Sequence, residues 1–130
     1  MKKNKFRVWH KEKKCWMSLH NNGYSFNPNN GQIYYEGLNV SSRIDLMQYT
    51  GLKDKDGKEI YEGDIVRIFV PHDPEEKEYV SKVYELDGAF VVDMVGHDIY
   101  MDVHCIGWIP GGYELEVIGN IYESLDLIKN

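Results

Sequence analysis

The chain has 130 residues, a length that suits one compact domain, or one domain with a small appendage, and needs no disulfide or metal for stability. Its two cysteines form no CxxC pair, which argues against a disulfide framework and a zinc ribbon. No stretch approaches the roughly 20 apolar residues that cross a bilayer, and no apolar segment follows the basic N-terminus, so we expect a cytoplasmic protein with no membrane partner.

The net charge of −6 is unevenly distributed along the chain. Residues 1–14 hold seven Lys or Arg against Glu12 alone, which leaves the rest of the chain strongly acidic. An acidic body repels a phosphate backbone, so nucleic-acid binding would have to use the basic end.

The first part of the chain is predicted to form hairpins. The segments "KFRVW" and "CWMSL" flank the charged turn "HKEKK", which is the pattern of an opening β-hairpin. Asn-Gly turns between residues 21 and 31 lead into the short strand "QIYYE". We therefore expect an N-terminal β-hairpin layer over residues 1–45.

The densest patterning lies in "LMQYTGLKDKDGKEIYEGDIVRIFV", residues 46–70. It predicts a strand, a tight turn at "DKDG", and a second strand that is interrupted at "EGD". Gly57 is expected to take positive φ in the turn, and Gly63 to mark a bulge or bend. The residues assigned to structural turns are Gly51, Asp54, Gly57 and Gly63.

Short strands continue to the end of the chain in "YVSKVYE", "AFVVDMV", "IYMDVHCI" and "YELEVIG". Alternation in "IYMDVHCI" places Cys105 on the inward face. Strands at this spacing predict a mainly β fold with little helix, in which residues 46–130 form a small, partly closed SH3-like barrel. The boundary after residue 45 is soft, and a single domain over residues 1–130 is the alternative.

Catalytic motifs are not found. The "DKDG" turn lacks the acidic ligands of an EF-hand, and the nucleophile elbow and the phosphate-binding loops are missing. Strand and turn residues that could reach a divalent metal are His72, Asp93, His97, Asp102 and His104, but nothing fixes their geometry. We therefore predict no catalytic residue, no metal and no cofactor, and a metal-dependent hydrolase is only the third interpretation.

The basic hairpin combines aromatic rings with positive charge, a combination typical of single-strand binding. The residues of this alternative site are Arg7, Trp9, Lys11, Lys13, Lys14 and Trp16. Against it, an overall pI near 5.3 lacks the usual electrostatic footprint of a nucleic-acid-binding protein.

The segments "MQYTGLKDKDGKEIYEGDIV" and "EVIGNIYES", together with the opening "KFRVW", resemble the YopX-like family of phage and prophage proteins. The residues that match its signature are Gln48, Tyr49, Thr50, Gly51, Leu52, Asp54, Gly57, Ile60, Tyr61, Glu62, Gly63 and Asp64. The resemblance implies a small cytoplasmic β-rich protein encoded by a bacteriophage or prophage, and it implies no enzymatic activity.

The function predicted from these observations is that of a non-enzymatic binding module, an accessory protein that acts through a host or phage protein in the bacterial cell. The binding surface is assigned to Tyr49, Tyr61, Glu62 and Asp64, because small barrels present aromatic edges to peptides. Single-stranded nucleic-acid binding by the hairpin is the alternative. Oligomeric state is left open, a homo-oligomer included.

Overall fold

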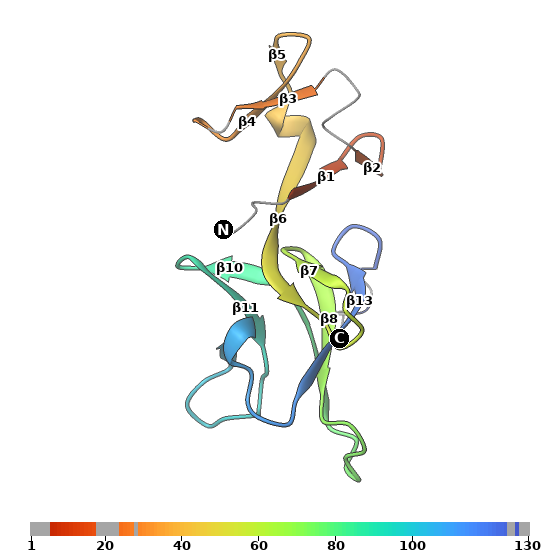
Figure 1. Cartoon of the computed structure of the whole chain (residues 1–130), viewed down its shortest axis with the longest axis vertical. Helices are drawn as coiled ribbons and strands as arrows, with labels where there is room; N and C mark the ends of the chain where they lie inside the picture. The colour runs from red at the N-terminus through yellow and green to blue at the C-terminus, as the bar shows by residue number, and fades with distance from the viewer. Residues whose placement is uncertain (1–5, 18–23, 28, 125–126, 128–130) are drawn as a thin grey trace. The chain divides into compact units, whose positions relative to one another are not determined.

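The computed structural model describes residues 6–17, 24–27, 29–124 and 127, and its regular secondary structure consists almost entirely of antiparallel strands (Figure 1). Its helical elements are the short 3₁₀ turns η1 (Ser41–Arg43) and η2 (Ile106–Trp108). The described part of the chain contains no helix with the length and hydropathy needed to cross a membrane. The prediction of a mainly β protein with little helix is confirmed.

The chain divides into two compact units, Lys3–Gln48 and Tyr49–Asn130, called here the N-terminal unit and the C-terminal unit. Strand β6 (Ile44–Lys53) contributes residues to both. The first part of β6 pairs with β1 (Phe6–His10), and the later part pairs with β7 (Glu59–Tyr61).

The N-terminal unit contains the expected opening hairpin. Strand β1 pairs with β2 (Cys15–Met17) on one side and with β6 on the other. A second sheet has the order β3 (Tyr24–Asn27), β4 (Gln32–Tyr35) and β5 (Leu38–Asn39). A small apolar core is formed by Val8, Ile33, Val40 and Ile44.

The C-terminal unit contains two three-stranded antiparallel sheets. One has the order β13 (Glu114–Asn120), β8 (Asp64–Phe69) and β9 (Glu78–Lys82), and Figure 1 shows β8 and β13 side by side. The other has the order β10 (Tyr84–Leu86), β11 (Ala89–Asp93) and β12 (Val103–Cys105).

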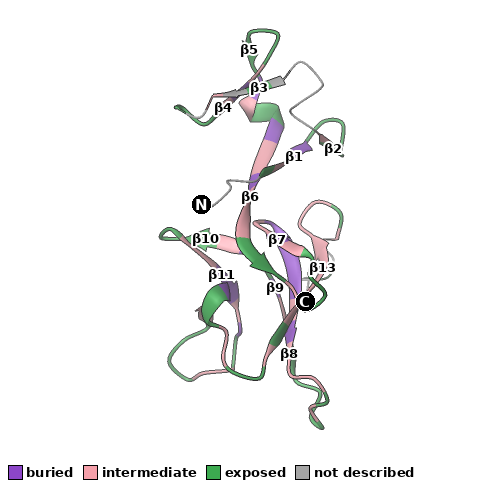
Figure 2. Ribbon diagram, viewed as in Figure 1, coloured by how far each residue is buried: buried purple, intermediate pink, exposed green. Residues whose placement is uncertain are grey.

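One core cluster joins the elements of the C-terminal unit. It consists of Ile60, Val66, Ile68, Val83, Val92, Met94 and Ile106, contributed by strands of both sheets, by η2 and by β7. Figure 2 shows β8 buried along most of its length, as expected for the central strand of its sheet. Burial of these side chains supplies the main driving force for folding of this unit.

Two details of the last strands differ from the sequence-based expectation. The strand predicted at residues 99–106 is limited to β12, because residues 95–102 form an open loop. Cys105 was predicted to face inward, but it is exposed, and His104 is the partly buried neighbour. Val103 and His104 are both partly buried, so burial in this three-residue strand does not follow the predicted alternation.

Backbone hydrogen bonds of Gly63 and Asp64, in the "EGD" segment, connect distant parts of the C-terminal unit. The Gly63 N–H donates a hydrogen bond to the carbonyl of Val83 at 2.8 Å, and the Val83 N–H donates to the carbonyl of Asp64 at 2.8 Å. The carbonyl of Gly63 accepts a bond from Ile121 at 2.9 Å. Gly63 has φ of +87°, a conformation that a side chain disfavours, which explains the glycine here.

Asp54 fixes the "DKDG" turn to the edge of a sheet. Its Oδ1 accepts hydrogen bonds from the N–H groups of Asp56 and Lys58, each at 2.9 Å. Its Oδ2 accepts a bond from the N–H of Val117 at 2.9 Å, where the register of β13 shifts. Partial burial alone would raise the pKa of Asp54, but the three backbone N–H groups outweigh it, so the pKa lies below its ordinary value of 3.8.

Replacement of Asp54 by alanine should lower the free energy of unfolding by about 2 kcal/mol, because three N–H groups lose a charged acceptor. The wild-type carboxylate contributes stability above the unfolded-state pKa, and that contribution is lost as pH falls through the lower folded-state pKa. Urea denaturation at pH 7 and about pH 3 measures the free energy of unfolding. This free energy should fall less on acidification for Asp54→Asn than for the wild type.

The matched control is Asp56→Asn, because this exposed carboxylate pairs with the side chain of Lys55 instead of with the sheet. An Asp54→Asn protein with the same acid sensitivity as the wild type would contradict the assigned role.

Candidate binding surface

Tyr49 and Tyr61 face each other across the β6–β7 pair. Their ring centroids lie 5.5 Å apart, and both side chains are half-buried. The Tyr61 hydroxyl donates to Glu59 Oε1 at 3.3 Å. Glu62, the next residue of the chain, is also half-buried. The structure therefore brings together the two tyrosines predicted for a binding surface, with Glu62 directly after them.

Asp64, the fourth residue predicted for this surface, lies inside the C-terminal unit. It is only 1% exposed, and its Oδ2 accepts a hydrogen bond from the N–H of Tyr61 at 2.8 Å. A buried carboxylate needs such bonds to offset the cost of desolvation. In this position Asp64 holds the turn between β7 and β8 and offers no charge to a partner.

Trp108, which no sequence motif above includes, is unusually exposed for a tryptophan. Its side chain is 84% exposed at the end of η2, whereas most tryptophans in folded proteins are largely buried. Leu52 lies against the same turn, because a Cβ on Gly107 would lie 3.8 Å from Leu52 Cδ1. We name Leu52, Gly107, Trp108 and Ile109 the Trp108 surface.

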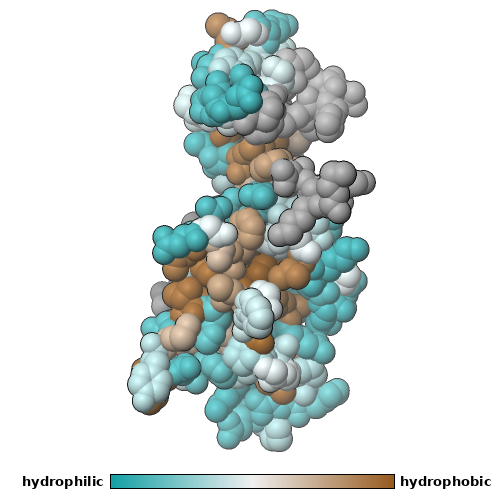
Figure 3. All heavy atoms as spheres, turned by 60° about the vertical axis from the view of Figure 1, so that its left-hand side comes forward, coloured by the Kyte–Doolittle hydropathy of each residue, from teal (hydrophilic) through white to brown (hydrophobic). Residues whose placement is uncertain are grey.

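A groove of about 360 Å³ adjoins the Trp108 surface. Its apolar lining comes from Ile106, Ile109 and Leu115, and its polar lining includes Lys53 and Glu114. Figure 3 shows apolar side chains gathered on the visible face of the C-terminal unit. The sequence signal that identifies Trp108 is a tryptophan inside "GWIPGG", where glycine and proline prevent a strand that would bury it.

The tryptophans of the N-terminal hairpin contact each other and Arg7 within the hairpin. Trp9 is 7% exposed, and its ring contacts that of Trp16 edge to face at a centroid distance of 4.9 Å. The guanidinium of Arg7 lies over the Trp16 ring at 4.6 Å. Trp9 is therefore not available to stack on a base, whereas Trp16 keeps 38% of its surface exposed.

The lysines of the hairpin differ in their surroundings. Lys11 forms an ion pair with Asp45 at 3.2 Å, which reduces its value as a phosphate contact. Lys13 and Lys14 are exposed in the turn, and Lys14 has φ of +51°. Three exposed lysines, one of them paired with a carboxylate, are a weak electrostatic site compared with the several contacts that give strong nucleic-acid binding.

The His and Asp residues that could reach a metal do not assemble into a site. His97 and His104 have ring centroids 5.7 Å apart, and Tyr113 lies beside them with its hydroxyl 3.3 Å from His97 Nδ1. Asp93 instead accepts a hydrogen bond from Tyr84 at 2.6 Å, which raises the pKa of Tyr84 to about 12. Among the described residues, no group of three or more His, Cys, Asp or Glu is placed to hold a metal ion.

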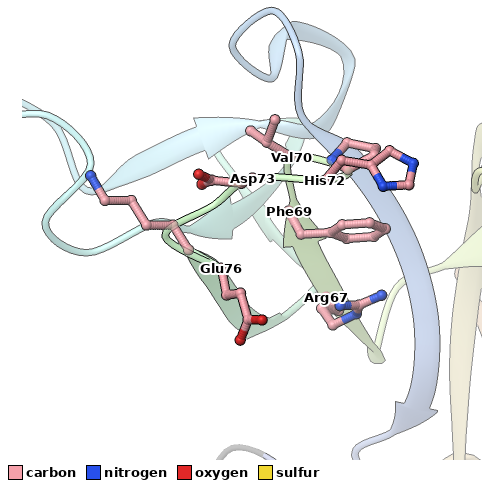
Figure 4. A pocket seen from close by; sticks show the side chains of 8 residues that line it. Arg67, Phe69, Val70, His72, Asp73 and Glu76 are labelled. Atoms are coloured by element: carbon pink, nitrogen blue, oxygen red, sulfur yellow. The ribbon is translucent and has the colours of Figure 1, made fainter.

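A second hollow, of about 320 Å³, lies at the end of β8. Figure 4 shows Phe69 between Arg67 and His72, and the guanidinium carbon of Arg67 lies 3.8 Å from the Phe69 ring centroid. Arg67 also pairs with Glu116 at 3.1 Å and with Glu78 at 3.2 Å. Because these carboxylates already neutralise Arg67, the hollow is poorly suited to an anionic ligand.

Comparison with known proteins identifies the family. The family model described as YopX protein matches residues 5–129. The chain is similar to the crystal structure of protein yopX from Bacillus subtilis, with 29% identity, a TM-score of 0.65, and coverage of 99% of this chain and 100% of that one. It is also similar to protein EF1440 from Enterococcus faecalis, with 25% identity, a TM-score of 0.57, and coverage of 97% and 98%. No curated protein matches the chain. The chain belongs to the YopX protein family.

Proposed function

We propose that this YopX family chain is a non-enzymatic binding module that acts through a protein partner. The observation that carries the proposal is the exposed Trp108 side chain beside a groove with a mixed apolar and charged lining. The C-terminal unit has a core that does not include Trp108, so folding does not explain its position. Exposed aromatic residues bordered by polar side chains are typical centres of protein–protein interfaces.

The setting we propose is the bacterial cytoplasm, with the protein acting as a phage or prophage accessory factor. The two similar solved structures come from bacteria, and the free, exposed Cys15 and Cys105 suit a reducing compartment. The finer fold assignment, a partly closed SH3-like barrel in the C-terminal unit, is supported by two three-stranded sheets around one core.

Trp108→Ala should reduce retention of the partner at least about tenfold, because a hot-spot aromatic contributes more than about 1.4 kcal/mol to binding. The measurement compares proteins captured from nuclease-treated Bacillus subtilis lysate by the immobilised wild type and the variant. The thermal midpoint should not change, because the removed side chain is exposed.

Leu38→Ala is the matched control, because Leu38 is 70% exposed and lies in the N-terminal unit. It should retain the same proteins as the wild type. Equal capture by the wild type and Trp108→Ala would remove the Trp108 surface from the proposal.

Tyr61→Ala should lower the free energy of unfolding by about 1 kcal/mol, because it removes a cross-strand aromatic pair. Glu62→Gln should leave stability unchanged and change capture only if Glu62 touches the partner. Denaturation midpoints together with the capture assay separate the two roles. If Tyr61→Ala kept its stability and lost the partner, the tyrosines would be contact residues, as the sequence first indicated.

Nucleic-acid binding by the hairpin should be weak. We expect the anisotropy of labelled single-stranded DNA and RNA to change little when the protein is added, because Trp9 is buried and Lys11 is paired. The variants Lys13→Ala and Lys14→Ala should give the same result as the wild type at every salt concentration. Titrations at several salt concentrations measure this. A log–log slope of about −0.7 per phosphate, reduced in the lysine variants, would instead establish the alternative function.

A further inference from the structure

Apolar side chains are exposed at the tip of the loop between β11 and β12. Ile99 is 89% exposed and Tyr100 is 86% exposed, and Met101 follows them with more than half of its surface exposed. The core of the C-terminal unit contains none of the three. We name residues 98–102 the apolar tip.

The base of this loop is fixed by backbone hydrogen bonds. The Met94 N–H donates to the carbonyl of Asp102 at 2.6 Å, and the His97 N–H donates to the carbonyl of Met94 at 3.1 Å. The Met94 side chain is fully buried in the core cluster. The loop therefore starts and ends at one anchored point.

Side chains add to this anchoring. The His97 and Tyr113 rings meet edge to face at a centroid distance of 5.2 Å. The Tyr100 N–H donates to Asp98 Oδ1 at 2.7 Å, which closes a turn at the apolar tip. A loop held in one conformation loses less conformational entropy when a partner binds.

The chain segment that contains the apolar tip is acidic. Residues 83–128 contain nine Asp or Glu and no Lys or Arg. Asp98 and Asp102 flank the three apolar residues, and no Lys or Arg side chain pairs with either carboxylate in the described part of the chain. Such a surface repels nucleic acid and anionic membranes and attracts a basic surface.

We propose that the apolar tip inserts into an apolar pocket bordered by Lys or Arg on the partner protein. The inference rests on the proposed function, since it names the chemistry of the partner that the binding module recognises. Ile99, Tyr100 and Met101 fill the pocket, and Asp98 and Asp102 pair with the basic border. The partner is a basic protein with a partly apolar surface.

The test places a photoreactive benzophenone amino acid at Tyr100 of the full chain, with Leu38 as the control position. Both proteins are irradiated in nuclease-treated Bacillus subtilis lysate, and the cross-linked peptides are identified by mass spectrometry. We expect cross-links from position 100, and none from position 38, to a segment with apolar residues next to Lys or Arg. Their yield should fall at least about fivefold between 50 mM and 500 mM salt, because salt screens exposed charges.

Two further variants test the two parts of the tip. Ile99→Ser combined with Met101→Ser removes apolar area, and Asp98→Asn combined with Asp102→Asn removes charge while an amide oxygen still accepts the Tyr100 N–H. Each double variant should lower the cross-link yield at least about fivefold and leave the thermal midpoint unchanged. The salt dependence should become weaker only in the asparagine pair.

Cross-links to lipid, to nucleic acid, to a second copy or to an acidic segment would overturn the inference, and so would a yield independent of salt. If Trp108→Ala loses the partner while both tip pairs retain it, the inference fails and the proposed function stands. If neither Trp108 nor the tip affects capture, both fail.

Discussion

The C-terminal unit depends on one short piece of backbone, Gly63 and Asp64. The Gly63 N–H bonds to Val83, the Gly63 carbonyl accepts a bond from Ile121, and the Asp64 carbonyl accepts one from Val83. Two consecutive residues thereby connect the end of β7, the break between β9 and β10, and the segment after β13. The positive φ of Gly63 makes this geometry accessible at low cost.

Several residues of the predicted family signature form structural hydrogen bonds in this part of the chain. The carboxylate of Asp54 accepts hydrogen bonds from three backbone N–H groups, and the Thr50 hydroxyl donates a hydrogen bond to the carbonyl of Ile60 at 2.7 Å. Asp64 holds the β7–β8 turn from within. Leu52 is different, because it lies against Gly107, next to the exposed Trp108. The signature thus supports the surface at which we place the partner.

One segment of the C-terminal unit combines exposed apolar side chains with negative charge. Residues 83–128 include the exposed Ile99, Tyr100 and Trp108 and contain no Lys or Arg. Apolar area supplies affinity and is not directional, whereas charge determines which partners approach. A basic protein satisfies both requirements, and an anionic polymer satisfies neither.

The sequence by itself determined the β content, the opening hairpin, the turn at Gly57 and the interruption at Gly63, because alternation and turn residues act within a few positions of the chain. It also supplied the residues of the family signature. Only the tertiary structure decided which signature residues are buried, since the bond of Asp54 to Val117 spans 63 positions. The start of β12, the burial of Trp9 and the exposure of Trp108 likewise depend on packing between distant segments, which local sequence patterns do not specify.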